Sequence, residues 1–339
     1  MSSYERRLPE AQRRTLRRAQ WLQLVWILVL FSIIAAIYLS AGNSQAMKTA
    51  WIEDALSLVP PIAFLAATWI EGWEPNARFP LGYVRVSSIS YLVSSVALAG
   101  VAIFLIIDST LTLIRTEHAT IGSVEIFGTT LWFGWVMIAA LLYSVIPPVI
   151  FGRLKMKPAR ELHDKTLWAD AFMNKADWLT GLAGIVGVLG IGIGWWWADA
   201  VAAMIIAADV LRDGFKHTRA AIHDLMDEMP KTVDDSEFEP LIDQVRAHLN
   251  ALSWVEESRL RFGEEGRYLA GSIFLVTAEG EPTPERLEQL ERDILSLHWR
   301  MLDVAIMPRS KRAQPLVGEM GEAGLRPLPK DRVGESGAR

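Results

Sequence analysis

The chain has 339 residues and a formal net charge of −5, and 51% of its residues are hydrophobic while only 22% are charged. The absence of cysteine excludes a disulfide scaffold, a thiolate zinc site and a cysteine nucleophile, and the mildly acidic balance argues against a nucleic-acid partner. Twelve of the fourteen tryptophans precede residue 200, whereas most charges lie in the first 20 residues or after residue 210, so the composition predicts an apolar body with polar ends.

Six segments are long and apolar enough, or nearly so, to cross a hydrocarbon core of about 30 Å as α-helices. They cover residues 21–39, 50–70, 89–114, 127–150, 167–193 and 196–211. Lys and Arg gather before the first segment, in the second and fourth connections and after the last segment; Lys155 is among those in the fourth connection. The positive-inside rule therefore places both termini in the cytoplasm, and we expect an integral protein of a bacterial inner membrane.

After Pro230 the pattern becomes that of a small soluble unit. The expected elements are a helix over residues 234–250, strands over 254–262 and 267–277 joined by a GEEG turn, a helix from 283 or 284 to 298, and a strand over 301–307. This order predicts a two-layer α+β domain. The expected organisation is a basic cytoplasmic tail (1–20), a membrane domain (21–212), a cytoplasmic domain (213–308) and a disordered tail (309–339).

Acidic residues inside apolar segments are costly, so each requires a physical explanation. On the fifth segment Asp170, Met173, Asn174 and Asp177 fall at positions i, i+3, i+4 and i+7, which puts them on one helical face. Two carboxylates, an amide oxygen and a thioether on an inward face could line a path for a cation. The alternative for Asp170 is solvation near the cytoplasmic end, and Lys175 could instead neutralise an acidic neighbour. Only Asp177 is both deep and on the polar face.

The second segment carries Glu53, Asp54 and Ser57 within about one turn. Pro60 and Pro61 follow, and because proline removes backbone hydrogen bonds they predict a kink. A kink also frees carbonyl groups that can face a cation.

Three segments together resemble the cation diffusion facilitator family. Residues 78–93 (RFPLGYVRVSSISYLV) resemble the family's start of span three, residues 168–187 (WADAFMNKADWLTGLAGIVG) its span five, and residues 196–230 its span six and the exit from it. The resemblance implies six transmembrane helices followed by a ferredoxin-like cytoplasmic domain with α-β-β-α-β order. It also implies a homodimer that transports a divalent cation.

In this family two ligands four residues apart on span two and two on span five hold the transported cation. By this resemblance the positions fall on Glu53 and Ser57, or on Asp54 after a small shift, and on Met173 and Asp177. Met173 stands where the family usually has histidine. A site with carboxylates, a hydroxyl, an amide and a thioether is harder than a zinc site, so it could favour manganese or iron over zinc, or it could be degenerate.

The predicted function is therefore efflux of zinc, manganese or iron by alternating access, in exchange for protons, because a carboxylate must lose its proton to bind metal. We expect no resident cofactor. Two alternatives remain open on the same scaffold: a non-transporting interaction or dimerisation protein, and a transporter of a different cation or solute. The sequence has no Walker loop, Gly-x-Ser-x-Gly motif or His-Glu-x-x-His motif, so we do not expect an enzyme.

Overall fold

The computed structural model describes residues 8–40, 45–115, 122–126, 129–278, 280 and 282–309. The chain divides into two compact units, Met1–Leu225 and Met226–Arg339. The sequence placed this boundary between residues 212 and 213, but the last helix of the first unit continues to Leu225. The predicted tail after residue 309 lies outside the described residues.

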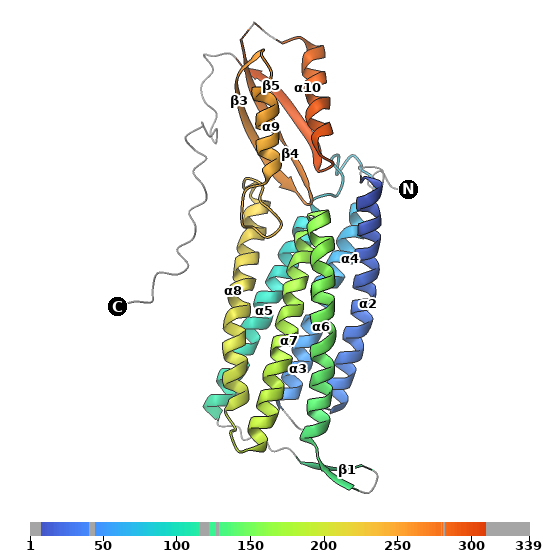
Figure 1. Cartoon of the computed structure of the whole chain (residues 1–339), viewed down its shortest axis with the longest axis vertical. Coiled ribbons are helices and arrows are strands. Elements are labelled where there is room, and N and C mark those ends of the chain that lie inside the picture. The colour runs from blue at the N-terminus through green and yellow to red at the C-terminus, as the bar shows by residue number, and fades with distance from the viewer. Residues whose placement is uncertain are drawn as a thin grey trace, which may run out of the picture. The chain divides into compact units, whose positions relative to one another are not determined.

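The first unit is built from seven described helices, of which five are long (Figure 1). They are α2 (Glu10–Ser40), α3 (Gln45–Leu56), α4 (Val59–Glu71), α5 (Val86–Arg115), α6 (Gly134–Leu162), α7 (Lys165–Gly192) and α8 (Ala198–Leu225). Among the described residues, four stretches are long and apolar enough to cross a membrane: Glu10–Ser40, Trp51–Glu71, Val86–Arg115 and Gly134–Leu162. Helices α7 and α8, with 28 residues each, are not among these four. Because α2 begins at Glu10, much of the predicted basic tail is helical.

The predicted kink in the second segment is a break between two helices, α3 and α4. The amide of Ser57 still bonds to the carbonyl of Glu53 at 3.0 Å, which closes the last turn of α3. Pro60 and Pro61 lie in the first turn of α4, where the missing N–H groups would have no helical partner in any case. The break therefore places Ser57 at a helix end in the interior of the unit.

The fourth segment differs from the prediction at both ends. Strand β1 (Ser123–Ile126) pairs antiparallel with β2 (Thr129–Trp132), and α6 begins only at Gly134. The start at residue 127 was therefore wrong, since Thr129–Trp132 consists of β-branched, apolar and aromatic residues that suit a strand. At the other end α6 continues past residue 150 to Leu162 despite Pro147 and Pro148, which brings Lys155 into the helix.

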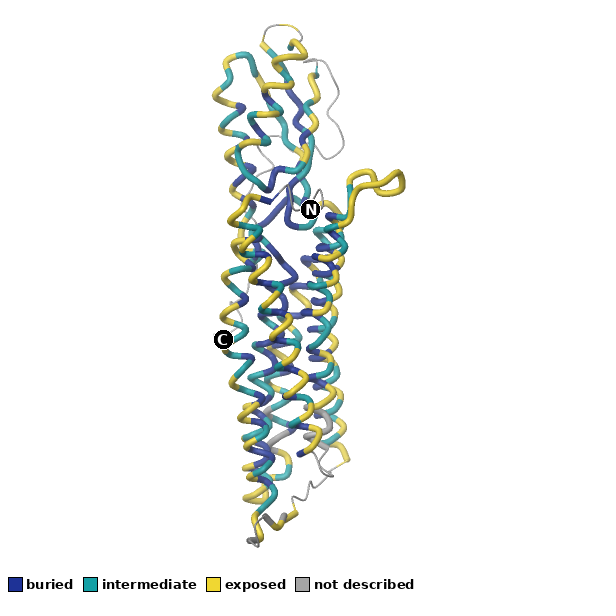
Figure 2. The backbone as a smooth tube through the Cα atoms, turned by 90° about the vertical axis from the view of Figure 1, so that its right-hand side faces the viewer, coloured by how far each residue is buried: buried dark blue, intermediate teal, exposed yellow. Residues whose placement is uncertain are grey.

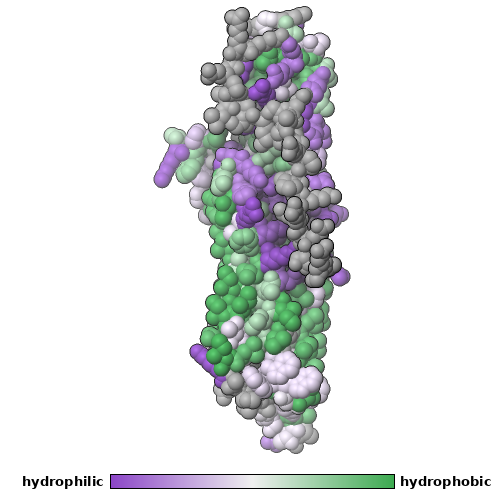
Figure 3. Space-filling model, turned by 90° about the vertical axis from the view of Figure 1, so that its left-hand side faces the viewer, coloured by the Kyte–Doolittle hydropathy of each residue, from purple (hydrophilic) through white to green (hydrophobic). Residues whose placement is uncertain are grey.

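Small residues allow the helices of the first unit to approach closely. A Cβ atom added at Gly214 on α8 would lie 2.7 Å from the backbone nitrogen of Ala99 on α5, so only glycine fits this crossing. Buried residues follow the inward sides of the helices (Figure 2), and large apolar side chains such as Leu28, Ile114 and Ile205 lie exposed on the outer sides. Hydrophobic residues form a broad band on the face shown in Figure 3, which suits a surface covered by lipid.

The second unit follows the predicted α-β-β-α-β order. Its elements are α9 (Pro240–Asn250), β3 (Val255–Glu265), β4 (Tyr268–Thr277), α10 (Pro284–Leu297) and β5 (Met301–Arg309). The sheet has the order β3-β4-β5, in which β4 pairs antiparallel with β3 and parallel with β5. Strand β3 takes in most of the predicted GEEG turn, so the chain reverses at Gly266, whose φ of 66° favours glycine.

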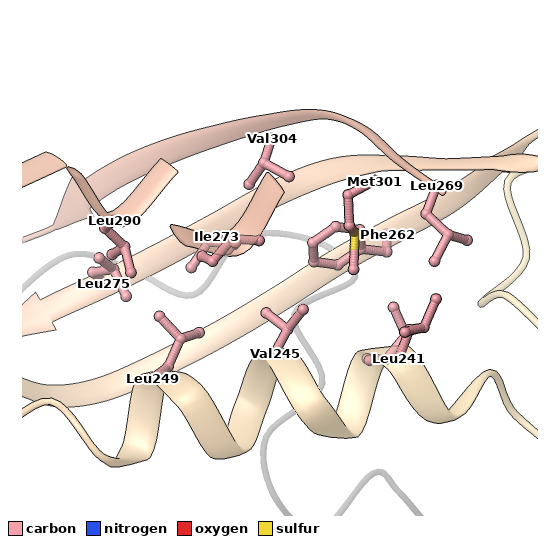
Figure 4. Packing of buried hydrophobic residues seen from close by; sticks show 12 residues of the cluster. Leu241, Val245, Leu249, Phe262, Leu269, Ile273, Leu275, Leu290, Met301 and Val304 are labelled. Atoms are coloured by element: carbon pink, nitrogen blue, oxygen red, sulfur yellow. The ribbon is translucent and has the colours of Figure 1, made fainter. Parts of the chain in front are cut away.

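The core of the second unit lies between its helices and its sheet. Leu241, Val245 and Leu249 of α9 point toward the strands (Figure 4), where Ile273 and Leu275 of β4 are fully buried. The helix residues recur every three or four positions and the strand residues every two, as expected for elements that each bury one face. The apolar spacing of α9 in the sequence thus specified its buried face correctly.

Candidate cation site

A direct hydrogen bond joins the break between α3 and α4 to the middle of α7. The Ser57 hydroxyl donates to Oδ1 of Asp177 at 2.6 Å, although the two residues are 120 positions apart in the chain. Both side chains are buried, with only 1% and 4% of their surface exposed. The bond therefore connects the two segments that the sequence predicted to hold a cation.

Two further carboxylates lie beside this hydrogen bond. Glu53 and Asp54 are on the turn of α3 that precedes Ser57, and both are buried. Each lies close enough to Asp177 for their charges to interact. The structure therefore brings together Glu53, Asp54, Ser57 and Asp177.

These three carboxylates have acceptor capacity that the protein does not fill. Oε1 of Glu53, Oδ2 of Asp54 and Oδ2 of Asp177 are buried and accept no hydrogen bond. Neighbouring negative charges away from water are costly unless a proton or a cation neutralises them. The cluster is therefore suited to binding either one. The described part of the chain contains no group of three or more His, Asp or Glu side chains already spaced to hold one metal ion.

Asp170 and Asn174 belong to a second, separate polar cluster. Nζ of Lys155 on α6 lies 2.6 Å from Oδ2 of Asp170 and donates to Oδ1 of Asn174 at 3.3 Å. Gln23 on α2 donates its side-chain amide to Asp170. All four side chains are completely buried. The alternative in which water solvates Asp170 is therefore wrong, because a buried lysine neutralises it.

Met173, the remaining member of the predicted α7 face, and Lys175 lie away from both polar clusters. Met173 packs in an apolar cluster with Leu98 and Val101 of α5 and Val210 of α8. Lys175 turns away from the face toward α8, where it pairs with two aspartates, Asp209 at 3.0 Å and Asp213 at 3.1 Å. The predicted face of α7 therefore carries Asp170, Met173, Asn174 and Asp177, but these residues contact three different groups of neighbours.

Sequence reasoning missed two participants, Lys155 and Gln23. Lys155 was assigned to a cytoplasmic connection because the fourth segment was ended at residue 150, before the helix itself ends at Leu162. Following the helix past Pro148 would have placed the lysine on a buried turn. Gln23 was detectable as a single amide in the apolar run WLQLVWILVLF, since a polar side chain within a membrane helix is rare and usually finds a partner.

Long apolar helices and an acidic interior site together define an integral membrane protein with a candidate ion site. A family model for the cation efflux transmembrane domain matches residues 21–226, which is more than half of the chain. The chain therefore belongs to the cation efflux family, also called the cation diffusion facilitator family, as its sequence motifs predicted.

Curated relatives agree with this assignment. The chain is 25% identical over 213 residues to a cadmium, cobalt and zinc/H(+)-K(+) antiporter of Bacillus subtilis, a match that covers 61% of this chain and 63% of that protein. It is 25% identical over 248 residues to the putative transporter MamV of Paramagnetospirillum magneticum, covering 73% and 69% of the two chains. It is 31% identical over 210 residues to the magnetosome protein MamB of the same organism, covering 60% and 67%. The chain thus spans less than two thirds of the Bacillus relative.

Proposed function

We propose that this protein transports a divalent cation and that the cation binds between α3 and α7 beside Asp177. The observation that carries the proposal is the buried hydrogen bond from Ser57 to Asp177, with Glu53 and Asp54 next to it. Carboxylate and hydroxyl oxygens from two helices can hold a cation only while those helices stay together, so a small relative movement changes the affinity. The name of the Bacillus subtilis relative, an antiporter for cadmium, cobalt and zinc, supports this choice of substrate class.

The transport cycle we propose is alternating access with proton exchange. Six spans would form the membrane domain: α2, α3 with α4, α5, α6, α7 and α8. The carboxylates hold either protons or the cation, because metal binding requires the ionised form. Cation arriving from the cytoplasm would displace protons, and protons from the far side would displace the cation. The direction is therefore efflux driven by the proton gradient.

We propose that the second unit and the two termini have the arrangement that is usual in the family. The second unit is a ferredoxin-like cytoplasmic domain that joins two copies into a homodimer, and both termini lie in the cytoplasm of a bacterial cell. The α-β-β-α-β order and the excess of Lys and Arg in the alternate connections support this arrangement.

The donor set favours a hard cation. The groups around Asp177 supply carboxylate and hydroxyl oxygens, and Met173 packs among hydrocarbon side chains. Oxygen donors suit manganese and ferrous iron better than zinc, which favours nitrogen and sulfur ligands. We therefore propose manganese or iron as the preferred substrate, with zinc bound more weakly.

The test is transport by the full-length protein in sealed vesicles that contain a pH indicator. Zinc, manganese, iron, cobalt and cadmium are added in turn, and cation uptake and proton release are recorded. At least one cation should drive proton movement, and Asp177→Asn should abolish it. The control is Asp108→Asn, which makes the same change at an aspartate of α5 outside the Glu53, Asp54 and Asp177 cluster, and it should transport normally. The absence of coupled flux with all five cations, or an unchanged rate in Asp177→Asn, would contradict the proposal.

A second candidate function is a non-transporting interaction protein on the same scaffold. Two observations favour it: Met173 stands where the family usually has histidine, and the described residues include no preformed three-ligand metal group. Calorimetric titration of wild type and Asp177→Asn separates the two functions. A non-transporting protein would give the same small heats in both, whereas a transporter would lose its cation binding in the variant.

A further inference from the structure

Lys155 is a completely buried lysine in the interior of the helical unit. Its ammonium lies 2.6 Å from Asp170 and 3.3 Å from the side-chain oxygen of Asn174, and it sits 4.8 Å from the ring centre of Trp26. Lysine is almost never fully buried unless it is paired, and an ionisable residue at this position in a membrane protein usually has a function.

The groups around Lys155 resemble those that would surround a bound metal ion. Asp170 and Asn174 of α7 offer side-chain oxygens to the ammonium, and Gln23 of α2, which donates its side-chain amide to Asp170, carries a further side-chain oxygen. Oδ1 of Asp170 and Oε1 of Gln23 are buried and have no hydrogen-bond partner. Two helices, α7 and α2, thus contribute oxygen donors at one buried position, and the ammonium of Lys155 on α6 occupies the place of a cation.

The charge of Lys155 also reaches the proposed transport site. Asp170 and Asp177 are separated by seven residues, or about 10 Å along the helix. The charges of Lys155 and Asp177 interact across the polar face of α7. A divalent ion beside Asp177 is therefore repelled by the ammonium group, and Asp170 reduces this repulsion because it is the counter-charge of the lysine.

We propose that Lys155 is a resident cation that fills the Asp170–Asn174 position and excludes metal from it. Asp170 and Asn174 are then positioning partners of the lysine and not metal ligands. One metal ion binds per chain, at Asp177 only. This inference rests on the proposed function for the Asp177 site, but the position that Lys155 occupies can be tested by itself.

The first experiment opens that position. Lys155→Met keeps a side chain of similar length without its charge, and the purified full-length protein is titrated with Mn²⁺ by calorimetry. Wild type should bind one ion per chain and Lys155→Met one more than wild type, because the freed oxygens form a hard-cation site. The double variant Lys155→Met/Asp170→Asn should lose the additional ion. If Lys155→Met gains no ion, or if wild type already binds two, the inference is overturned.

The second experiment needs no gain of binding and covers the case in which Lys155→Met fails to fold. Asp170→Asn alone leaves the ammonium without its counter-charge, so Mn²⁺ affinity at Asp177 should fall about 10- to 100-fold. In Lys155→Met/Asp170→Asn both charges are gone, and the affinity should return to within about threefold of wild type. If the double variant keeps the loss, Asp170 is itself a metal ligand and the inference is wrong. A merely structural pair would leave affinity unchanged in Asp170→Asn, which also overturns it.

Failure of the proposed function gives a different pattern. In that case wild type binds no metal and Asp177→Asn changes nothing, yet Lys155→Met still gains a Mn²⁺ ion that the double variant loses. If instead wild type binds through Asp177 but Lys155→Met gains no ion, the proposed function stands and the resident-cation inference fails.

Discussion

Removing the hydroxyl of Ser57 tests the proposed site at its best-defined contact. Ser57→Ala deletes the 2.6 Å hydrogen bond to Asp177 and leaves the helix break and its backbone bonds intact. The hydroxyl fixes the orientation of the Asp177 carboxylate and supplies an additional oxygen for the cation. We therefore expect weaker metal binding without unfolding of the helical unit.

The size of the effect follows from the kind of bond that is lost. A hydrogen bond to a charged group contributes about 1.5–3 kcal/mol. Since about 1.4 kcal/mol corresponds to a factor of ten in an equilibrium constant, Ser57→Ala should weaken Mn²⁺ binding roughly 10- to 150-fold. Burial of both partners argues for the upper part of this range, because water cannot replace the missing hydroxyl easily.

The assay is calorimetric titration of wild type, Ser57→Ala and Ser57→Thr in the same detergent. Ser57→Thr is the matched control because it keeps the hydroxyl, and its affinity should stay within a few-fold of wild type. Without metal, Ser57→Ala should still unfold cooperatively but at a lower temperature than wild type, because a buried hydrogen bond is lost, whereas Ser57→Thr should match wild type. If Ser57→Ala binds Mn²⁺ as tightly as wild type while Asp177→Asn does not, Ser57 has no part in the site and the orienting role assigned to it is wrong.

Two further predictions concern the folding of each unit. Arg300→Met should lower the free energy of unfolding of the second unit by about 3–5 kcal/mol, because the buried guanidinium pairs with Glu239 and Glu264. Hydrogen exchange of the β4 and β5 amides measures this loss. A loss below about 1 kcal/mol would contradict the prediction. Gly214→Ala should destabilise the helical unit by about 1–3 kcal/mol, since its Cβ would lie 2.7 Å from a backbone nitrogen of α5. Gly100→Ala is the control, because a Cβ at residue 100 would lie in open space. Its thermal unfolding temperature should be at least as high as that of wild type.

The sequence alone determined the elements whose formation depends on local pattern. Apolar runs located α2, α5 and the body of α6, and residue periodicity specified α10 and the strands of the second unit to within about three residues, whereas α9 begins at Pro240 and not at residue 234. The motifs on the third, fifth and sixth segments were sufficient to identify the family. Spacing along α7 correctly placed Asp170 and Asp177 on one face, but it indicated that only Asp177 is deep, whereas both are buried. These features could be read because side-chain direction along one helix or strand follows from its own geometry.

Only the tertiary structure decided which side chains meet. The hydrogen bond from Ser57 to Asp177 joins residues 120 positions apart, and the ion pair of Lys155 and Asp170 depends on α6 extending past its prolines to pack against α7. One face of α7 therefore carries a candidate site and a separate neutralised pair, although the spacing of its polar residues suggested a single path. Periodicity fixes the direction in which a side chain leaves its helix, but the partner it meets depends on how the neighbouring helices pack.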